Sequence, residues 1–528
     1  MPSSTTRTRA VTSLTLLCVC AAFAGTACAG GGSSPNSDNP SPGSTPPGGD
    51  PTKLPPVGGT PDASELTNAL GVFVSPGGAA GNDGSLERPL NSIQAGIDLA
   101  KRVRKRVYVC TGTFRESIVL ADSISIIGAL DCGTAAYWRL GGAPTRIEAP
   151  SSPAVRAKDI ASPTRLEGLD IVAPNAKDPA GSSIGLFADH AAALTIANSK
   201  ITAGDAADGA KGTEGIQLVQ TDPYNGGGVG TVSDALCVNG DTCFFGAGGW
   251  VSPLGGGGGR SSCTGAPNHN GGDGGSGGSG GLWKPGGTPA ITWHWLDDAP
   301  ANAPAIGQDR PRTPPILGTS GTPGAPLGAL TEAGYVSNTG VAGTNGAPGN
   351  GGYGGWGIGP PVKQANLAQG EVWRGKGGPG GGAGGCPGLA GTAGTGGGAS
   401  IALALIESPV VVDGTQLVAG RGGAGGLGTF GSDPTAGGPA GTNATADSSA
   451  NARAGQNGAI PGMSPNGSSG PSVGVLHSGA APTLRGSTKI TPGQAGAAIN
   501  DRSRTDPLGN PRTVPATPAG ISKDILAL

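Results

Sequence analysis

Acidic and imidazole side chains are the residues of this chain whose types could perform acid–base chemistry. Cleavage of a glycosidic bond by paired carboxylates, or by carboxylates that hold calcium, needs acids that lie close together. Asp170, Asp189 and Asp413 are isolated in the sequence, and none belongs to a DD pair, a GHG or an RxK motif. The sequence also shows no GxSxG nucleophile elbow, phosphate loop or HExxH motif. It therefore predicts no catalytic residue.

The four histidines are far apart, and no Cys/His cluster has the spacing of a zinc site. His269 lies in an NHN tripeptide inside a glycine-rich stretch, which is typical of a turn. His190 and His477 occupy related places in two internal repeats, but the repeat between them has Glu407 there. Stacked imidazoles remain an alternative, and we favour a solvated face. We expect neither a metal nor a cofactor.

Tryptophan is concentrated in one part of the chain, because six of the seven lie between residues 250 and 373. Trp293 and Trp295 flank one histidine in a WHW tripeptide, so on an extended strand both belong to the same face. They could form a stacking platform for sugar rings or the small apolar core of a glycine-rich lobe. We favour the core, because this region has few other apolar anchors.

The N-terminus reads as an export signal. Arg7 and Arg9 precede an apolar run at residues 11–23, which is too short to span a membrane. The run ends in Gly-Thr-Ala-Cys, which resembles a bacterial lipobox and predicts lipidation of Cys28; the alternative is ordinary cleavage nearby. Residues 29–61 are polar and rich in Pro, Gly and Ser, which predicts a tether.

Three segments can be laid over one another, beginning at Ser183, Ser400 and Ser472. Each has Ser, a β-branched residue and a small residue at its start, an apolar run later, and a closing Gly. Units this short cannot bury an apolar face alone and must stack on their neighbours. The β-branched content predicts an all-β fold, a right-handed parallel β-helix with one repeat per turn. A short amphipathic helix at 92–104 is expected to precede the strands.

Six cysteines remain after the signal and the lipobox, an even number that suits disulfides in an exported protein. Cys110 and Cys132 are 22 residues apart, which matches one turn of the repeat, so we expect them to be bonded; two buried free thiols are the alternative. Cys237 with Cys243 could close a small loop. That would leave Cys263 with Cys386 by elimination.

The opening of this region resembles a known group of proteins. The segment VFVSPGGAAGNDGSLERPLNSIQAGIDLA, then VYVCTGTF, then IIGALDC followed by Trp138, is similar to the start of bacterial surface lipoproteins with a pectin-lyase-like β-helix. The resemblance covers residues 70–204 best and implies the fold and a cell-surface location. It implies little about chemistry.

Two glycine-rich insertions interrupt the repeats, leaving after Gly204 and Gly420. The chain has 105 Gly and 47 Pro, and Gly often recurs every third residue, as at 385, 388, 391, 394 and 397. Period three is that of polyproline-II-type helices, so packed helices of this kind or disordered loops are both open. The composition resembles the glycine-rich domains of PE-PGRS surface proteins.

These observations predict a lipid-anchored surface protein with a binding, adhesive or structural role; the alternative is a polysaccharide lyase or glycoside hydrolase of the pectin-lyase-like class. We expect contact with the outer membrane through the lipid and, as partner, an extracellular polysaccharide or another surface protein. Nucleic acid is excluded as a partner by a net charge of -2. The expected segments are a signal peptide (1–27), a tether (28–69), β-helix (70–204, 400–420 and 472–500), insertions (205–399 and 421–471) and a C-terminal tail or cap (501–528).

Overall fold

The computed structural model describes part of the chain and shows a strand-rich molecule. The described residues are 62–134, 137–221, 225, 256–264, 282–285, 293–295, 313–355, 362–363, 373–374, 379–442 and 452–528. They contain a single α-helix, α1 (Ile93–Val103), and a 3-10 helix, Ala63–Glu65. The expectation of an all-β fold is confirmed.

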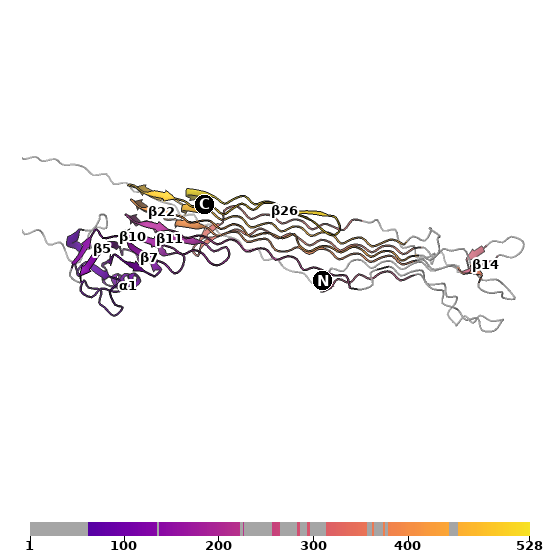
Figure 1. Ribbon diagram of the computed structural model, residues 1–528, viewed down its shortest axis with the longest axis horizontal. Helices are drawn as coiled ribbons and strands as arrows, with labels where there is room; N and C mark the ends of the chain where they lie inside the picture. Colours follow the sequence, from indigo (N-terminus) through magenta and orange to yellow (C-terminus); the bar gives the residue numbers. More distant parts are fainter. Residues whose placement is uncertain are drawn as a thin grey trace, which may run out of the picture. The chain divides into compact units, whose positions relative to one another are not determined.

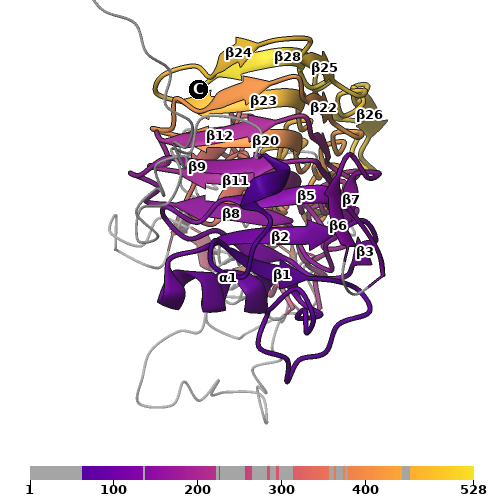
Figure 2. The ribbon, with the colours of Figure 1, turned by 90° about the vertical axis from the view of Figure 1, so that its left-hand side faces the viewer.

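Three parallel sheets make up a unit that we call the three-sheet coil (Figures 1 and 2). The first sheet contains β1 (Gly71–Val74), β2 (Arg106–Cys110), β5 (Ile126–Thr134), β9 (Thr164–Glu167), β12 (Leu194–Ala197), β21 (Val411–Asp413) and β24 (Thr483–Arg485), with β6 (Tyr137–Leu140) antiparallel to β5. The second contains β3 (Thr113–Phe114), β7 (Thr145–Glu148), β10 (Leu169–Val172), β13 (Lys200–Thr202), β22 (Gln416–Val418) and β25 (Lys489–Thr491). The third contains β4 (Ile118–Val119), β8 (Val155–Lys158), β11 (Ser183–Asp189), β20 (Ser400–Ile406), β23 (Ser472–Ser478) and β28 (Ser522–Ala527).

The chain visits the sheets in a fixed order, and each circuit stacks on the one before. Ser183 pairs with Ser400, and Ser400 pairs with Ser472, so the three repeats align in space as they do in sequence. Parallel stacking of equivalent residues places apolar side chains in continuous rows. One such row in the second sheet runs through Ile171, Ile201 and Leu417, all fully buried. Burying each of these side chains stabilises the fold by roughly 1.5–3 kcal/mol.

Helix α1 packs against the first strands of the coil. Ser92 caps its N-terminus by accepting a hydrogen bond from the main-chain N–H of Ala95. The carboxylate of Glu116 accepts from the main-chain N–H groups of the first two helical residues, Ile93 and Gln94. Ile93 and Ile97 are buried in the same apolar cluster as the strands β1 and β2. The helix expected at 92–104 is therefore confirmed, and its apolar face covers the first turn of the coil.

The Cys110–Cys132 disulfide is present, with 5.8 Å between the two Cα atoms. It lies in an apolar cluster with Phe73, Tyr108 and Trp138. The expected bond is confirmed, although strand pairing places Leu130, and not Cys132, directly opposite Cys110. Cys28, Cys237 and Cys243 lie outside the described residues.

Each insertion leaves the coil after a strand of the second sheet and returns at a strand of the third. The hydroxyl of the returning serine joins the exits of two successive circuits. Ser400 Oγ accepts from the N–H of Gly420, 2.8 Å away, and donates to the carbonyl of Gly204, 2.7 Å away. In the same manner, Ser183 Oγ accepts from the N–H of Gly204 and donates to the carbonyl of Pro174. Ser472 Oγ accepts from the N–H of Gly493 and donates to the carbonyl of Gly420, and Ser522 Oγ donates to the carbonyl of Gly493. We call this series the serine clamp.

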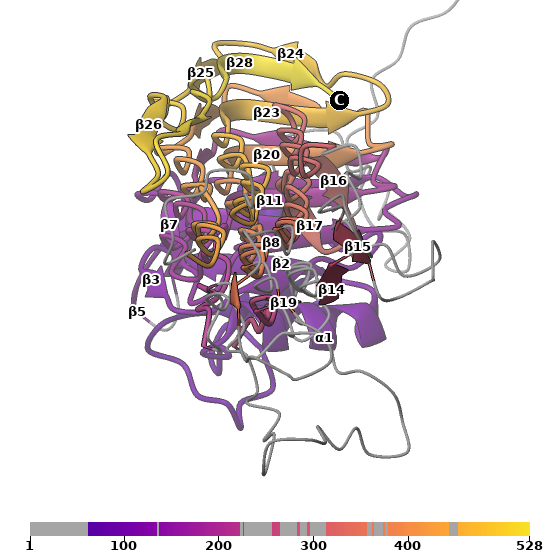
Figure 3. The same ribbon diagram turned by 90° about the vertical axis from the view of Figure 1, so that its right-hand side faces the viewer.

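Glycine-rich strands from the insertions form an ordered bundle among the described residues (Figures 1 and 3). Its central strand, 379–399, exchanges main-chain hydrogen bonds with five neighbours, segments 205–221, 256–264, 338–355, 421–442 and 452–471. Examples are Thr395 N to Ala210 O (3.0 Å), Gly349 N to Gly385 O (2.9 Å), Thr435 N to Cys386 O (2.9 Å) and Gly394 N to Pro465 O (3.0 Å). Bonds in several directions at intervals of three residues are the pattern of packed polyproline-II-type helices. Of the two alternatives that composition left open, the described stretches adopt the packed one.

Glycine is required in this bundle because neighbouring backbones touch. A β-carbon on Gly394 would overlap the carbonyl oxygen of Gly426, and one on Gly385 would overlap that of Thr435. Neither glycine has a positive φ, so the requirement is for space and not for a special backbone torsion.

Two hairpins accompany the coil and the bundle. Strands β16 (Ala329–Thr331) and β17 (Gly334–Val336) form one hairpin, whose Tyr335 packs with Ile184 and Ile401 on the third sheet. Residues 501–528, expected as a tail or cap, contribute the hairpin of β26 (Arg502–Thr505) and β27 (Pro511–Val514) and then strand β28. The stretch from 492 to 521 is thus a further insertion at the same corner, which the sequence did not reveal because it is poor in glycine.

Replacing the clamp serine Ser400 with alanine is expected to lower the free energy of unfolding by about 1–3 kcal/mol, because the partly buried N–H of Gly420 and carbonyl of Gly204 lose their partner. Chemical denaturation of the variant measures this. Ser320→Ala is the matched control, since Ser320 is exposed. Equal stabilities of the two variants would contradict a clamp.

Gly394→Ala is expected to destabilise the bundle by about 3 kcal/mol, because its methyl group meets a backbone that cannot move aside. Gly257→Ala is the control, since nothing lies within 4 Å of the position that its β-carbon would occupy. Limited proteolysis at a series of denaturant concentrations would compare them. Equal cleavage rates would show that close backbone contact does not hold the bundle together.

Candidate functional site

The three aspartates considered as catalytic candidates lie on three different sheets. Asp170 is on β10 and pairs with Arg146, 2.6 Å away. Asp189 is at the end of β11, where its carboxylate bonds His190 Nδ1 at 2.7 Å, and Asp413 is on β21. The coil therefore does not bring them together. Among the described residues, no group of three or more His, Cys, Asp or Glu side chains is placed to hold a metal ion.

The equivalence expected for His190 and His477 is wrong by two positions. Asp189 aligns with Ile406 and Ser478, so His190 falls beside Glu407, whereas His477 aligns with Leu405, two residues before Glu407. The His190 side chain is 62% exposed, but His477 as a whole is only 8% exposed and bonds the carbonyl of Gly479. The two imidazoles therefore do not stack.

A four-stranded antiparallel sheet gathers tryptophans from distant parts of the sequence. Its order is β15 (Trp293–Trp295), β14 (Leu282–Pro285), β19 (Trp373–Arg374) and β18 (Val362–Lys363). The backbone register pairs Trp295 with Trp283 and Trp283 with Trp373. Residues directly opposite one another across a sheet belong to the same face. We call Trp295, Trp283 and Trp373 the tryptophan row.

Trp293 joins the face of the tryptophan row, because it lies two residues from Trp295 on one strand. The sequence pointed to Trp293 and Trp295 only. It missed Trp283 and Trp373 because their place in the row depends on strand pairing between residues 90 positions apart. The side chains of this sheet, and with them the choice between a core and a platform, lie outside the described residues.

Both stretches of chain that supply this sheet begin and end on the glycine-rich bundle. The stretch with β18 and β19 leaves at Gly355 and returns at Pro379, and the N–H of Gly355 donates to the carbonyl of Pro379 at 2.7 Å. The stretch with β14 and β15 leaves at Thr264, whose N–H bonds Val219 O at 2.9 Å, and returns at Thr313, whose carbonyl accepts from Asn350. Strand pairing then joins the two stretches.

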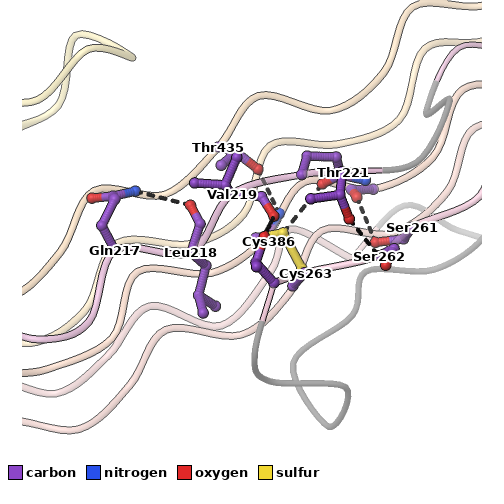
Figure 4. Close-up of a disulfide and its surroundings, with 12 residues drawn as sticks. Gln217, Leu218, Val219, Thr221, Ser261, Ser262, Cys263, Cys386 and Thr435 are labelled. Carbon is purple, nitrogen blue, oxygen red and sulfur yellow. Dashed lines mark hydrogen bonds between the residues drawn. A yellow bond between two sulfur atoms is a disulfide. The ribbon is translucent and has the colours of Figure 1, made fainter.

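A disulfide between Cys263 and Cys386 fastens the departing stretch to the central strand of the bundle (Figure 4). Both cysteines are buried with Leu218, and the N–H of Cys386 donates to Thr435 Oγ1 at 2.7 Å. The pairing reached by elimination is confirmed. Because the bond closes a loop of 123 residues, its constraint on the unfolded chain is worth about 4–5 kcal/mol.

A buried arginine fixes the β26–β27 hairpin to the bundle. Arg512 is 1% exposed; it donates to the carbonyls of Phe430 and Ser432 at 3.1 Å and pairs with Asp433 and Asp506. Burial alone would raise the pKa of Asp506, but hydrogen bonds from Asn510 and Arg512 outweigh it and lower the pKa below its ordinary value. The carboxylate therefore stays charged in the folded protein.

Comparisons with known proteins find no relative: no family model, curated protein or solved structure matches this chain. Within the part that the structure describes, no helix is both long and apolar enough to cross a membrane.

Asp506→Asn is expected to destabilise the protein at neutral pH by about 3 kcal/mol, because Arg512 loses a buried partner. The lowered pKa means that the stabilisation is present above the unfolded-state value of about 3.9 and is lost as pH falls through the folded-state pKa. Denaturation from pH 7 to pH 3 should show the difference from wild type shrinking in acid. Asp501→Asn, at an exposed position, is the control, and a pH-independent difference would contradict the argument.

Proposed function

We propose that this chain is a lipid-anchored cell-surface protein that binds an extracellular polysaccharide through the tryptophan row. In this proposal the three-sheet coil is a right-handed parallel β-helix of the pectin-lyase-like kind and serves as the base. The glycine-rich bundle carries the binding sheet. The role is adhesive, and no reaction is assigned to it.

The sequence and the disulfides support an exported location. An apolar run and a lipobox-like segment precede Cys28, whose lipid would hold the chain at the outer membrane, on its outer or its periplasmic side. Disulfides form and persist in oxidising compartments, and the described residues contain two.

The register that aligns three tryptophans on adjacent strands is the observation that carries the proposal. Because this row is longer than the Trp293 and Trp295 pair, we take the stacking platform in place of the apolar core that the sequence favoured. Adjacent strands lie about 4.8 Å apart, so the row offers a nearly continuous series of aromatic residues on one face. Aromatic rings bury the apolar faces of sugar rings while the hydroxyls stay in water. A linear polysaccharide presents such faces repeatedly, and the row can therefore hold several units of one chain.

The test compares Trp283→Ala with His294→Ala in the full chain, using a glycan array followed by titration of the glycans that bind. Trp283 is central in the row, whereas His294 alternates with the tryptophans on β15 and so belongs to the opposite face. We expect Trp283→Ala to weaken binding about tenfold or more, which corresponds to about 1.4 kcal/mol, and His294→Ala to leave it unchanged.

Unchanged glycan binding by Trp283→Ala would contradict the proposal. Release of shortened products from a pectin or alginate panel would favour a lyase or hydrolase instead. Retention on a surface protein, with no glycan bound, would move the assignment to a protein partner.

A further inference from the structure

A series of main-chain hydrogen bonds between two strands of the bundle stops before the strands end. Segments 313–324 and 452–471 run parallel, and the N–H groups of Gly318 and Gly321 donate to the carbonyls of Ile460 and Met463, both at 2.9 Å. Each step advances three residues on both strands. Three residues before Ile460, the next main-chain carbonyl in the series is that of Asn457. Three residues before Gly318, the residue that would donate to it is Pro315.

Proline has no N–H, so the series ends at this point for a chemical reason. Pro314 precedes Pro315, and segment 313–324 continues there without a bond to segment 452–471. Within the described residues, the main-chain carbonyl of Asn457 has no hydrogen-bond partner. The neighbouring carbonyls of the same face, at Ile460 and Met463, are both satisfied.

An open groove of about 440 Å³ lies where the series stops. Its walls are Pro314, Pro315 and Leu317 on one side and residues 455–460 on the other, with Asn510 from the β26–β27 hairpin beside them. None of these lining residues is charged. The side-chain carbonyls of Gln456 and Asn457 are used inside the bundle, accepting from Asn350 and Gly437. Within the part of the chain that the structure describes, their amide N–H₂ groups have no acceptor and are left to donate.

We propose that this groove binds an uncharged peptide strand in the polyproline-II conformation, which continues the bundle by one strand. The peptide would place an N–H opposite the carbonyl of Asn457 and receive hydrogen bonds from the amides of Gln456 and Asn457. This is the counterpart, in a bundle of polyproline-II-type helices, of the addition of a strand to the edge of a β-sheet. The site is made of residues other than the tryptophan row and does not depend on the proposed function.

The geometry of the existing donors defines the peptide. At Gly318 and Gly321 a β-carbon would overlap backbone atoms of neighbouring strands, so the residue that donates to Asn457 should be glycine. Proline at other positions favours the extended conformation before binding, which reduces the entropy lost when the peptide is ordered. A partner rich in Gly and Pro, and without charge, fits both requirements.

The test uses a fluorescein-labelled peptide of about twelve residues that repeats Gly-Ala-Pro, titrated by anisotropy with the full chain. Leu317→Arg fills the groove with a long charged side chain, and Ile316→Arg is the matched control. Leu317 lines the groove and is 62% exposed, whereas the adjacent Ile316 is 78% exposed and does not line it. Because both side chains are exposed, neither change should prevent folding.

We expect saturable binding to wild type, a dissociation constant raised about tenfold or more by Leu317→Arg, and no change with Ile316→Arg. A second peptide, in which valine replaces every glycine, should bind wild type with a dissociation constant that is also raised about tenfold or more. The proposal is overturned by absence of binding up to about 1 mM peptide. Equal binding by both variants, or displacement by a neutral oligosaccharide and not by unlabelled peptide, would overturn it as well. Trp283→Ala should not alter peptide binding, so this result is independent of the glycan test.

Discussion

Close approach of one backbone to another is the constraint on which the glycine-rich part of this protein depends. Each strand of the bundle exchanges N–H···O=C bonds with several neighbours, and the central strand does so with five. Such bonds form only where no side chain separates the two chains. Ordering a glycine costs about 1–2 kcal/mol of backbone entropy, so a single strand would not remain extended. Bonds in several directions from the same strand offset that cost, which makes the bundle a cooperative unit.

The three-sheet coil supplies what the bundle lacks, an apolar core and a defined starting point. Equivalent isoleucines and leucines stack along each sheet, and the serine clamp sets the places at which successive insertions leave and return. Because Ser183, Ser400 and Ser472 are stacked one above another, the strands that continue from them begin at a regular spacing. The close packing of the bundle follows from that regularity.

Covalent and ionic contacts hold the bundle where its own backbone bonds are not enough. The Cys263–Cys386 disulfide joins a departing stretch to the central strand, and Arg512 joins the last hairpin to carbonyls of the bundle. Both are buried, and both connect segments that are distant in sequence. Because these two contacts fasten its segments, the bundle can carry a separate sheet and present a groove without a large hydrophobic core.

The sequence by itself determined the elements whose signals are local or periodic. The helix after Ser92, the stacking of the repeats and the Cys110–Cys132 bond all followed from residue spacing, because helical and coil periods place particular side chains on one face. The packing of the glycine strands and the tryptophan row were decided by the tertiary structure alone. Glycine has no side chain to encode which strand lies beside which, and Trp283 meets Trp373 only through pairing across 90 residues.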